Sequence, residues 1–273
     1  MDWGYKVALT ATTVALLLTV GQLFGRRLAG ILAGLPTVTG PALIWLALEF
    51  GTDYAVEAAI GSIAACTLCA LFALAYERVS RRNGIAGALL SATVASVLLA
   101  PPLYWMHSGL MLTLVMAAVA SFVVYAVMPE DRDGAEPVRR LRGELVLTAL
   151  VSGAVSGAVA LSAPTVGPFW AGVLASPPLI AAAVAMHQHA FAGPASVRRF
   201  LRGYVAGLQG RVVFGAGFAL LITPFGVTRA ALVATVAGCV FTVATLRGYA
   251  RVEKTLLAHR SARSANATDT RID

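Results

Sequence analysis

The feature that most constrains this chain is a series of apolar runs, each about as long as a bilayer is thick. A membrane-spanning helix needs roughly 20 mostly apolar residues, because each residue rises only about 1.5 Å. Charged residues form 12% of the chain, where a soluble domain carries about 25%. We therefore predict an all-α polytopic membrane protein with nine spans, at residues 6–24, 28–50, 54–76, 84–101, 108–128, 145–163, 168–190, 203–223 and 227–246.

The basic residues give these spans a direction. If the loop at Arg26 and Arg27 lies in the cytoplasm and the spans alternate, 18 of the 21 Lys and Arg residues fall on the cytoplasmic side. Cytoplasmic loops of membrane proteins carry such an excess. The opposite side keeps only Lys6 and Arg229, so we expect the N-terminus outside and the C-terminus in the cytoplasm.

The same distribution excludes several classes of function. The net charge of +8 is spread over short clusters between apolar runs, without the basic face and interleaved aromatic residues of a nucleic-acid binder. Cys66 and Cys69 form one Cys-x-x-Cys pair inside an apolar run, and no second pair completes a zinc site. The sequence has no Walker-type nucleotide loop. We expect no cofactor, no metal and no enzymatic activity.

An internal repeat appears when the chain is aligned with itself at an offset of 142 residues. Five identities fall between residues 29–36 and 171–178, and Gly51, Gly61, Ala64 and Phe72 also recur. Predicted spans one to four fall on spans six to nine, whereas span five has no counterpart. An odd number of crossings then separates equivalent elements, so the second copy enters the membrane from the opposite face. Inverted repeats of this kind are typical of secondary transporters.

Proline residues interrupt spans two and seven near the middle of the membrane. Proline lacks an N–H and clashes with the carbonyl four residues earlier, so it leaves carbonyl oxygens without helical partners. Matched breaks at this depth favour a transport site; two packed proline kinks are the alternative. The candidate substrate-binding residues at the breaks are Pro36, Thr37, Thr39, Gly40, Pro41, Ser176, Pro177 and Pro178.

Arg211 is the one charged residue deep inside a predicted span. An arginine at that depth costs at least about 2.5 kcal/mol, so a partner must compensate it. No acidic residue shares its depth, which leaves backbone carbonyls, water or an anion. We therefore add Arg211 and neighbouring Gln209 to the candidate substrate-binding residues and expect the guanidinium to point inward, towards the proline breaks. The alternative is a side chain that extends to the lipid headgroups.

Two groups near the ends of spans are weaker candidates for gating or proton coupling. Glu49, Asp53 and Glu57 surround the outer end of spans two and three. His187 and His189 lie at the inner end of span seven, and one interpretation is a proton relay. In both groups, solvated or interfacial polar residues are the simpler interpretation.

The segment from Ala29 to Thr37, with its Ala-Gly-Ile-Leu-Ala-Gly-Leu-Pro-Thr order, and the following Glu49-Phe-Gly51 resemble the GlpM-like small bacterial inner-membrane proteins. The resemblance covers spans one to four and, more faintly, six to nine. It implies a bacterial inner-membrane protein and is consistent with the repeat. It implies no substrate and no catalytic residue.

Together these patterns predict a small secondary transporter that moves an anionic or zwitterionic small molecule. The alternatives are a non-transporting assembly or accessory protein and, with less support, a membrane-embedded lipid-modifying enzyme. Besides the lipid bilayer and the substrate, a homo-oligomeric partner is left open. The predicted organisation is a first repeat at 1–101, a linking helix and cytoplasmic loop at 102–142, a second repeat at 143–250 and a basic cytoplasmic tail at 251–273.

Overall fold

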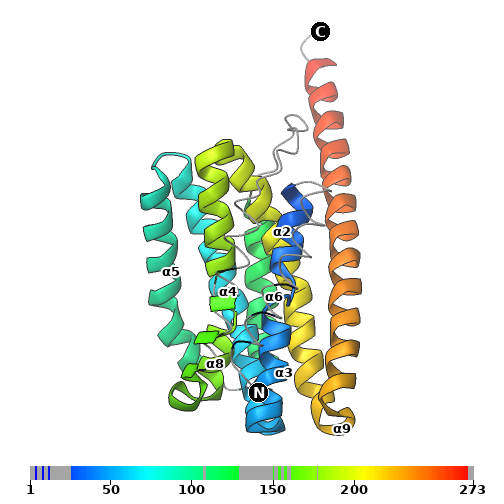
Figure 1. Ribbon diagram of the computed structural model, residues 1–273. Helices are drawn as coiled ribbons and strands as arrows, with labels where there is room; N and C mark the ends of the chain where they lie inside the picture. The colour runs from blue at the N-terminus through cyan, green and yellow to red at the C-terminus, as the bar shows by residue number, and fades with distance from the viewer. Residues whose placement is uncertain are drawn as a thin grey trace.

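The computed structural model describes residues 26–106, 109–128, 161–176 and 178–269, together with positions 4, 8, 12, 150, 153, 154, 157 and 158. Most of the first and sixth predicted spans, the loop at 129–144 and the candidate residue Pro177 lie outside the described residues. Every regular element in the described part of the chain is an α-helix, and the helices form an elongated bundle (Figure 1). The all-α class is therefore confirmed.

Spans two to five of the prediction correspond to five helices. The second span is divided into α2 (Arg26–Gly34) and α3 (Thr39–Phe50), and it is followed by α4 (Thr52–Ser80), α5 (Ile85–Met106) and α6 (Leu110–Val127). α5 continues through Pro101 and Pro102, so the predicted repeat boundary at residue 101 lies inside this helix. An apolar surrounding favours such continuation, because backbone groups that leave a helix there find no water.

The second half of the chain begins with α8 (Pro168–Leu174) and continues in α9 (Leu179–Asp269). α9 is much too long for one crossing, and its backbone is non-helical at Gly193 and Gly226, with φ of 76° and 75°. Figure 1 shows the chain reversing direction at both glycines. We call the three resulting parts α9a (179–192), α9b (194–225) and α9c (227–269).

Among the described residues, five helices are long and apolar enough to cross a membrane, when α2–α3 and the undivided α9 are each taken as one. Their burial differs strongly. In α4, 78% of the apolar window is buried inside the protein, whereas in α5 the share is 17%. The surfaces of α5, α6 and α9c expose large apolar side chains, including Leu98, Met111 and Val236. This distribution is compatible with membrane insertion, because lipid accepts the apolar surfaces that water would reject.

The two broken helices run in opposite directions. In Figure 1, α2–α3 starts at the end of the bundle where the C-terminus extends and runs towards the other end, whereas α8–α9a runs back. α4 and α9b are likewise antiparallel and form the interior, with Phe72, Tyr76, Tyr204, Phe214 and Phe218 among their buried side chains. Each broken helix therefore lies against an unbroken one from the other half of the chain.

Glycines allow this close packing. A Cβ atom at Gly30 of α2 would lie 2.1 Å from the carbonyl oxygen of Phe200 in α9b, and one at Gly172 of α8 would lie 1.8 Å from that of Ala58 in α4. Similarly close approaches join Gly61 to Phe169, and Gly203 to Arg27. Small residues let helix backbones approach each other in this way within membranes.

Candidate functional site

The first break separates α2 from α3 at residues 35–38. Pro36 has no N–H to donate, and the chain makes a tight turn in which the Thr37 N–H donates to the Leu35 carbonyl at 2.7 Å. The helix resumes when the Gly40 N–H donates to the Pro36 carbonyl at 2.8 Å. The last carbonyls of α2 thus lose their helical partners and require donors from elsewhere.

Arg211 of α9b supplies these donors. Its Nε donates to the Gly34 carbonyl at 3.0 Å, and one terminal nitrogen donates to the carbonyls of Ala33 at 3.1 Å and Leu35 at 3.4 Å. Only 5% of the residue is exposed. The prediction that the guanidinium points inward to the break is confirmed, and the interpretation as a lipid-facing arginine is wrong. The compensating groups are carbonyl oxygens at the negative end of a half-helix.

The second break separates α8 from α9a, and the Ala182 N–H donates to the Pro178 carbonyl at 2.7 Å where the helix resumes. The carbonyl of Ser176 accepts a hydrogen bond from the Cys69 thiol of α4 at 3.2 Å. The carbonyl of Ala175 accepts one from the Thr39 hydroxyl at 3.3 Å, and the hydroxyl oxygens of Thr39 and Ser176 are 2.9 Å apart. The two breaks therefore meet, and α3 contacts the end of α8 directly.

The groups around this meeting point form a buried polar centre. The Tyr204 ring centroid is 6.0 Å from Cζ of Arg211, and the thiols of Cys66 and Cys69 in α4 lie in the neighbourhood of the guanidinium. All these side chains are buried. The buried acid of α4, Glu77, is eight residues from Cys69, or about 12 Å along the helix axis. The centre thus has one positive charge and no adjacent carboxylate among the residues that the structure describes.

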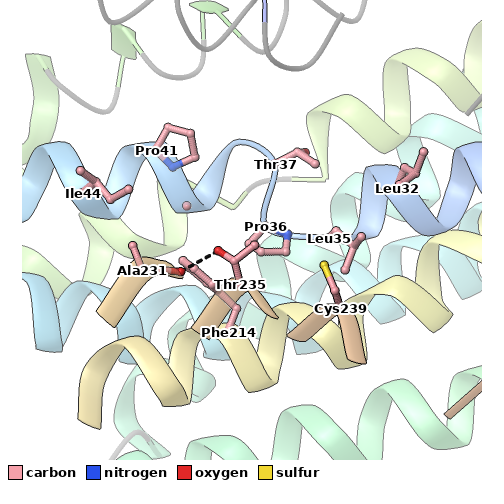
Figure 2. A pocket seen from close by; sticks show the side chains of 11 residues that line it. Leu32, Leu35, Pro36, Thr37, Pro41, Ile44, Phe214, Ala231, Thr235 and Cys239 are labelled. Atoms are coloured by element: carbon pink, nitrogen blue, oxygen red, sulfur yellow. Dashed lines mark hydrogen bonds between the residues drawn. The ribbon is translucent and has the colours of Figure 1, made fainter. Parts of the chain in front are cut away.

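A cavity of about 320 Å³ lies beside the first break. Thr37, Gly40 and Pro41 line it together with Leu35 and Pro36, and α9c closes the opposite side with Thr235 and Cys239 (Figure 2). Most of the lining is apolar. A smaller cavity of about 130 Å³ lies beside the second break, between α8, α4 and α5. Ser176 and Pro178 belong to its lining.

The remaining candidates lie away from the centre. The Gln209 amide donates to the Ala118 carbonyl of α6 at 3.1 Å, so this side chain faces away from the breaks. Glu49, Asp53 and Glu57 are exposed around the turn between α3 and α4. His189 lies 3.4 Å from the Tyr76 hydroxyl, measured from its Nδ1. The His187 ring lies against Phe191 in a tilted arrangement, with 4.6 Å between the ring centroids.

Sequence reasoning missed a buried acid. Glu77 near the end of α4 is 1% exposed and accepts hydrogen bonds from Arg81, whose Nε lies at 2.8 Å. Its carboxylate is also 3.3 Å from Nε of Arg198 in α9b and 3.6 Å from Nε of Arg78. The predicted span ended at residue 76, which placed Glu77 in a loop. The spacing of Glu77 and Arg81, four residues apart, was the available sign that the helix continues.

The comparisons with known proteins give no relative from which a role could be transferred. No family model, no curated protein and no solved structure matches the chain.

Proposed function

We propose that this protein is a small secondary transporter of the bacterial inner membrane that moves an anionic or zwitterionic small molecule by alternating access. In this proposal the chain crosses the membrane nine times, with the N-terminus outside and the C-terminus in the cytoplasm. Two inverted four-helix repeats are joined by α6, and the site lies where their broken helices meet. The resemblance to GlpM-like proteins remains part of this proposal.

Reciprocal contacts support the inverted repeat. If two halves are related by a twofold axis, a contact of residue i with residue j recurs between their partners, with the halves exchanged. At the offset of 142 residues, the approach of Gly30 to Phe200 becomes that of Gly172 to Ala58. The approach of Gly61 to Phe169 becomes that of Gly203 to Arg27. An inverted repeat accounts for both pairs of contacts.

Backbone details at the breaks support the same relation. The hydrogen bond from Gly40 to Pro36 corresponds at this offset to the one from Ala182 to Pro178. Gly51, which ends α3, has φ 89° and ψ 175°, and its counterpart Gly193, which ends α9a, has φ 76° and ψ 176°. The opposite directions of the two broken helices require an axis across the bundle rather than along it.

The meeting of the two breaks is the observation that carries the transport proposal. Half-helix ends and unwound backbone at the midplane are the usual substrate and ion sites of transporters with inverted repeats. Here the hydroxyls of Thr39 and Ser176 join the breaks, so a conformational change that separates the two breaks must break this contact. A rigid accessory protein has no need for two interrupted helices at the same place.

The charge of the centre favours an anionic group on the substrate. The end of a helix offsets about half an elementary charge, so the carbonyls of α2 neutralise Arg211 only in part. No carboxylate completes the compensation within the described part of the centre, and burial makes the remaining positive charge effective over a longer range. A carboxylate or phosphate that enters the adjacent cavity would be attracted to it.

The test combines a ligand screen with transport. We would measure the thermal unfolding of the purified protein with carboxylates, amino acids and phosphate esters, and then the uptake of stabilising compounds into proteoliposomes. We expect at least one anion or zwitterion to stabilise the protein and to be taken up. Arg211→Lys keeps the charge but loses the planar fork, so we expect its affinity to fall about tenfold or more.

Arg229, an exposed arginine in the first turn of α9c, provides the matched control, and Arg229→Lys should behave as the parent protein. Stabilisation by neutral or cationic compounds alone would overturn the substrate class. A failure of all compounds to be taken up, in a protein that they stabilise, would overturn transport itself.

A further inference from the structure

The two half-helix ends that meet at the centre are terminated by different groups at equivalent positions. Residue 211 of α9b corresponds to residue 69 of α4 at the repeat offset, and Gly34 corresponds to Ser176. The hydrogen bond from Arg211 to the Gly34 carbonyl and the one from Cys69 to the Ser176 carbonyl are thus counterparts. One end receives a cation, and the other receives a neutral thiol.

This difference separates two roles that Arg211 could have. If its role were only to donate hydrogen bonds to the freed carbonyls, neutral groups would suffice, as Cys69 and Thr39 demonstrate at the end of α8. A guanidinium adds a full charge to a buried position, where charges are costly. The charge itself therefore calls for an explanation beyond the capping of α2.

The surroundings of the guanidinium have the chemistry of a site for a monovalent cation. Three carbonyl oxygens, from Ala33, Gly34 and Leu35, converge on it at 3.0 to 3.4 Å. Helix ends and unwound carbonyls of this kind hold the coupling cation in transporters with broken helices. The described part of the centre lacks the carboxylates with which Ca²⁺ and Mg²⁺ are usually bound.

We propose that the end of α2 is a cation site in which the Arg211 guanidinium is a permanent, tethered occupant in place of a diffusible Na⁺ ion. The positive charge that an anionic substrate needs is then always present. Its consequence, substrate uptake that requires no Na⁺, rests on the proposed transport function. The occupancy of the site does not, and it can be measured without a substrate.

The structure predicts what happens when the tether is removed. Arg211→Ala leaves the three carbonyls and, beside the Tyr204 ring, the space that the guanidinium group occupied. Free guanidinium has the same shape and charge as the lost group, and Na⁺ can use the same oxygens. We expect this variant to unfold at a lower temperature than the parent protein and to bind either cation.

The experiment measures thermal unfolding of the purified full-length protein in Na⁺, K⁺, guanidinium or choline chloride at equal ionic strength, with guanidinium at low millimolar, non-denaturing concentrations. We expect the unfolding temperature of the parent protein to be the same in all four salts. Arg211→Ala should gain several degrees with guanidinium, in a saturable manner, and a smaller amount with Na⁺. Arg229→Ala should lose little stability and gain nothing.

Two results would overturn the proposal. One is a specific stabilisation of the parent protein by Na⁺, which would mean that the cation site is elsewhere or vacant. The other is an Arg211→Ala variant that folds but responds to none of the cations. If that variant does not fold, Arg211→Lys provides the second measurement: its tethered ammonium group should keep the protein indifferent to Na⁺, and a response to Na⁺ would contradict the proposal. None of these results depends on whether a substrate is transported.

Discussion

The two helix breaks have nearly the same backbone and different chemistry. Each restarts its helix with a hydrogen bond to a proline carbonyl, at 2.8 Å for Pro36 and 2.7 Å for Pro178. Yet the first break faces Arg211 and a cavity of about 320 Å³, whereas the second faces Cys69 and a cavity of about 130 Å³. The backbone geometry is thus common to both halves, whereas the positive charge and the larger cavity occur only at the first break.

The strongest test of the shared geometry replaces the glycines at which the broken helices cross their partners. A side chain at Gly30 or Gly172 would overlap a backbone carbonyl that cannot move independently. We expect Gly30→Leu and Gly172→Leu to destabilise the protein by about 3 kcal/mol or more, at the upper end of overpacking costs. Thermal unfolding and the yield of monodisperse protein would show this loss.

Gly248→Ala in α9c is the control, because a Cβ there meets nothing within 4 Å. Its stability should be unchanged or slightly raised. A large loss at only one of the two crossing glycines would mean that the halves pack differently, and the reciprocal contacts would lose their value as evidence for a repeat.

The chemical difference between the halves extends to Glu77, whose counterpart in α9b is Ala219. Glu77→Gln keeps the shape and removes the charge that lies against Arg198 and Arg81. We expect a loss of about 2 kcal/mol, less than for a fully buried pair because both arginines are partly exposed. Denaturant unfolding would measure it, with exposed Glu57→Gln as the control. Equal losses of stability for the two substitutions would mean that the buried charge of Glu77 does not stabilise the protein.

The smallest effect is expected where the breaks touch. Thr39→Val removes the hydroxyl that donates to Ala175 and contacts Ser176. The expected loss of stability is about 1 kcal/mol, the net value of one neutral hydrogen bond. Thr37→Val, at the wall of the larger cavity, is the matched control. If Thr39→Val is as stable as the parent protein, the hydrogen bonds between the two breaks contribute nothing to stability.

Local signals in the sequence were sufficient to predict the all-helical class and the two helix breaks. Nearly continuous apolar composition predicted helical spans, because in lipid the backbone must satisfy its hydrogen bonds internally. Pro36 and Pro178 predicted the two breaks, because the missing N–H is a property of the residue itself. The inward direction of Arg211 also followed from a local argument, the cost of a charge at that depth.

The tertiary structure alone decided which groups meet. That Thr39 contacts Ser176, and that Arg211 and Cys69 donate to the carbonyls at the two breaks, depends on helices more than 100 residues apart packing at glycines. Gln209 faces α6 although it is two residues from Arg211, because successive positions on a helix point about 100° apart. Glu77 lies against Arg198 because α9b packs on α4. The sequence of a segment determines which of its backbone and charged groups require a partner. The packing of distant segments determines which residue provides that partner.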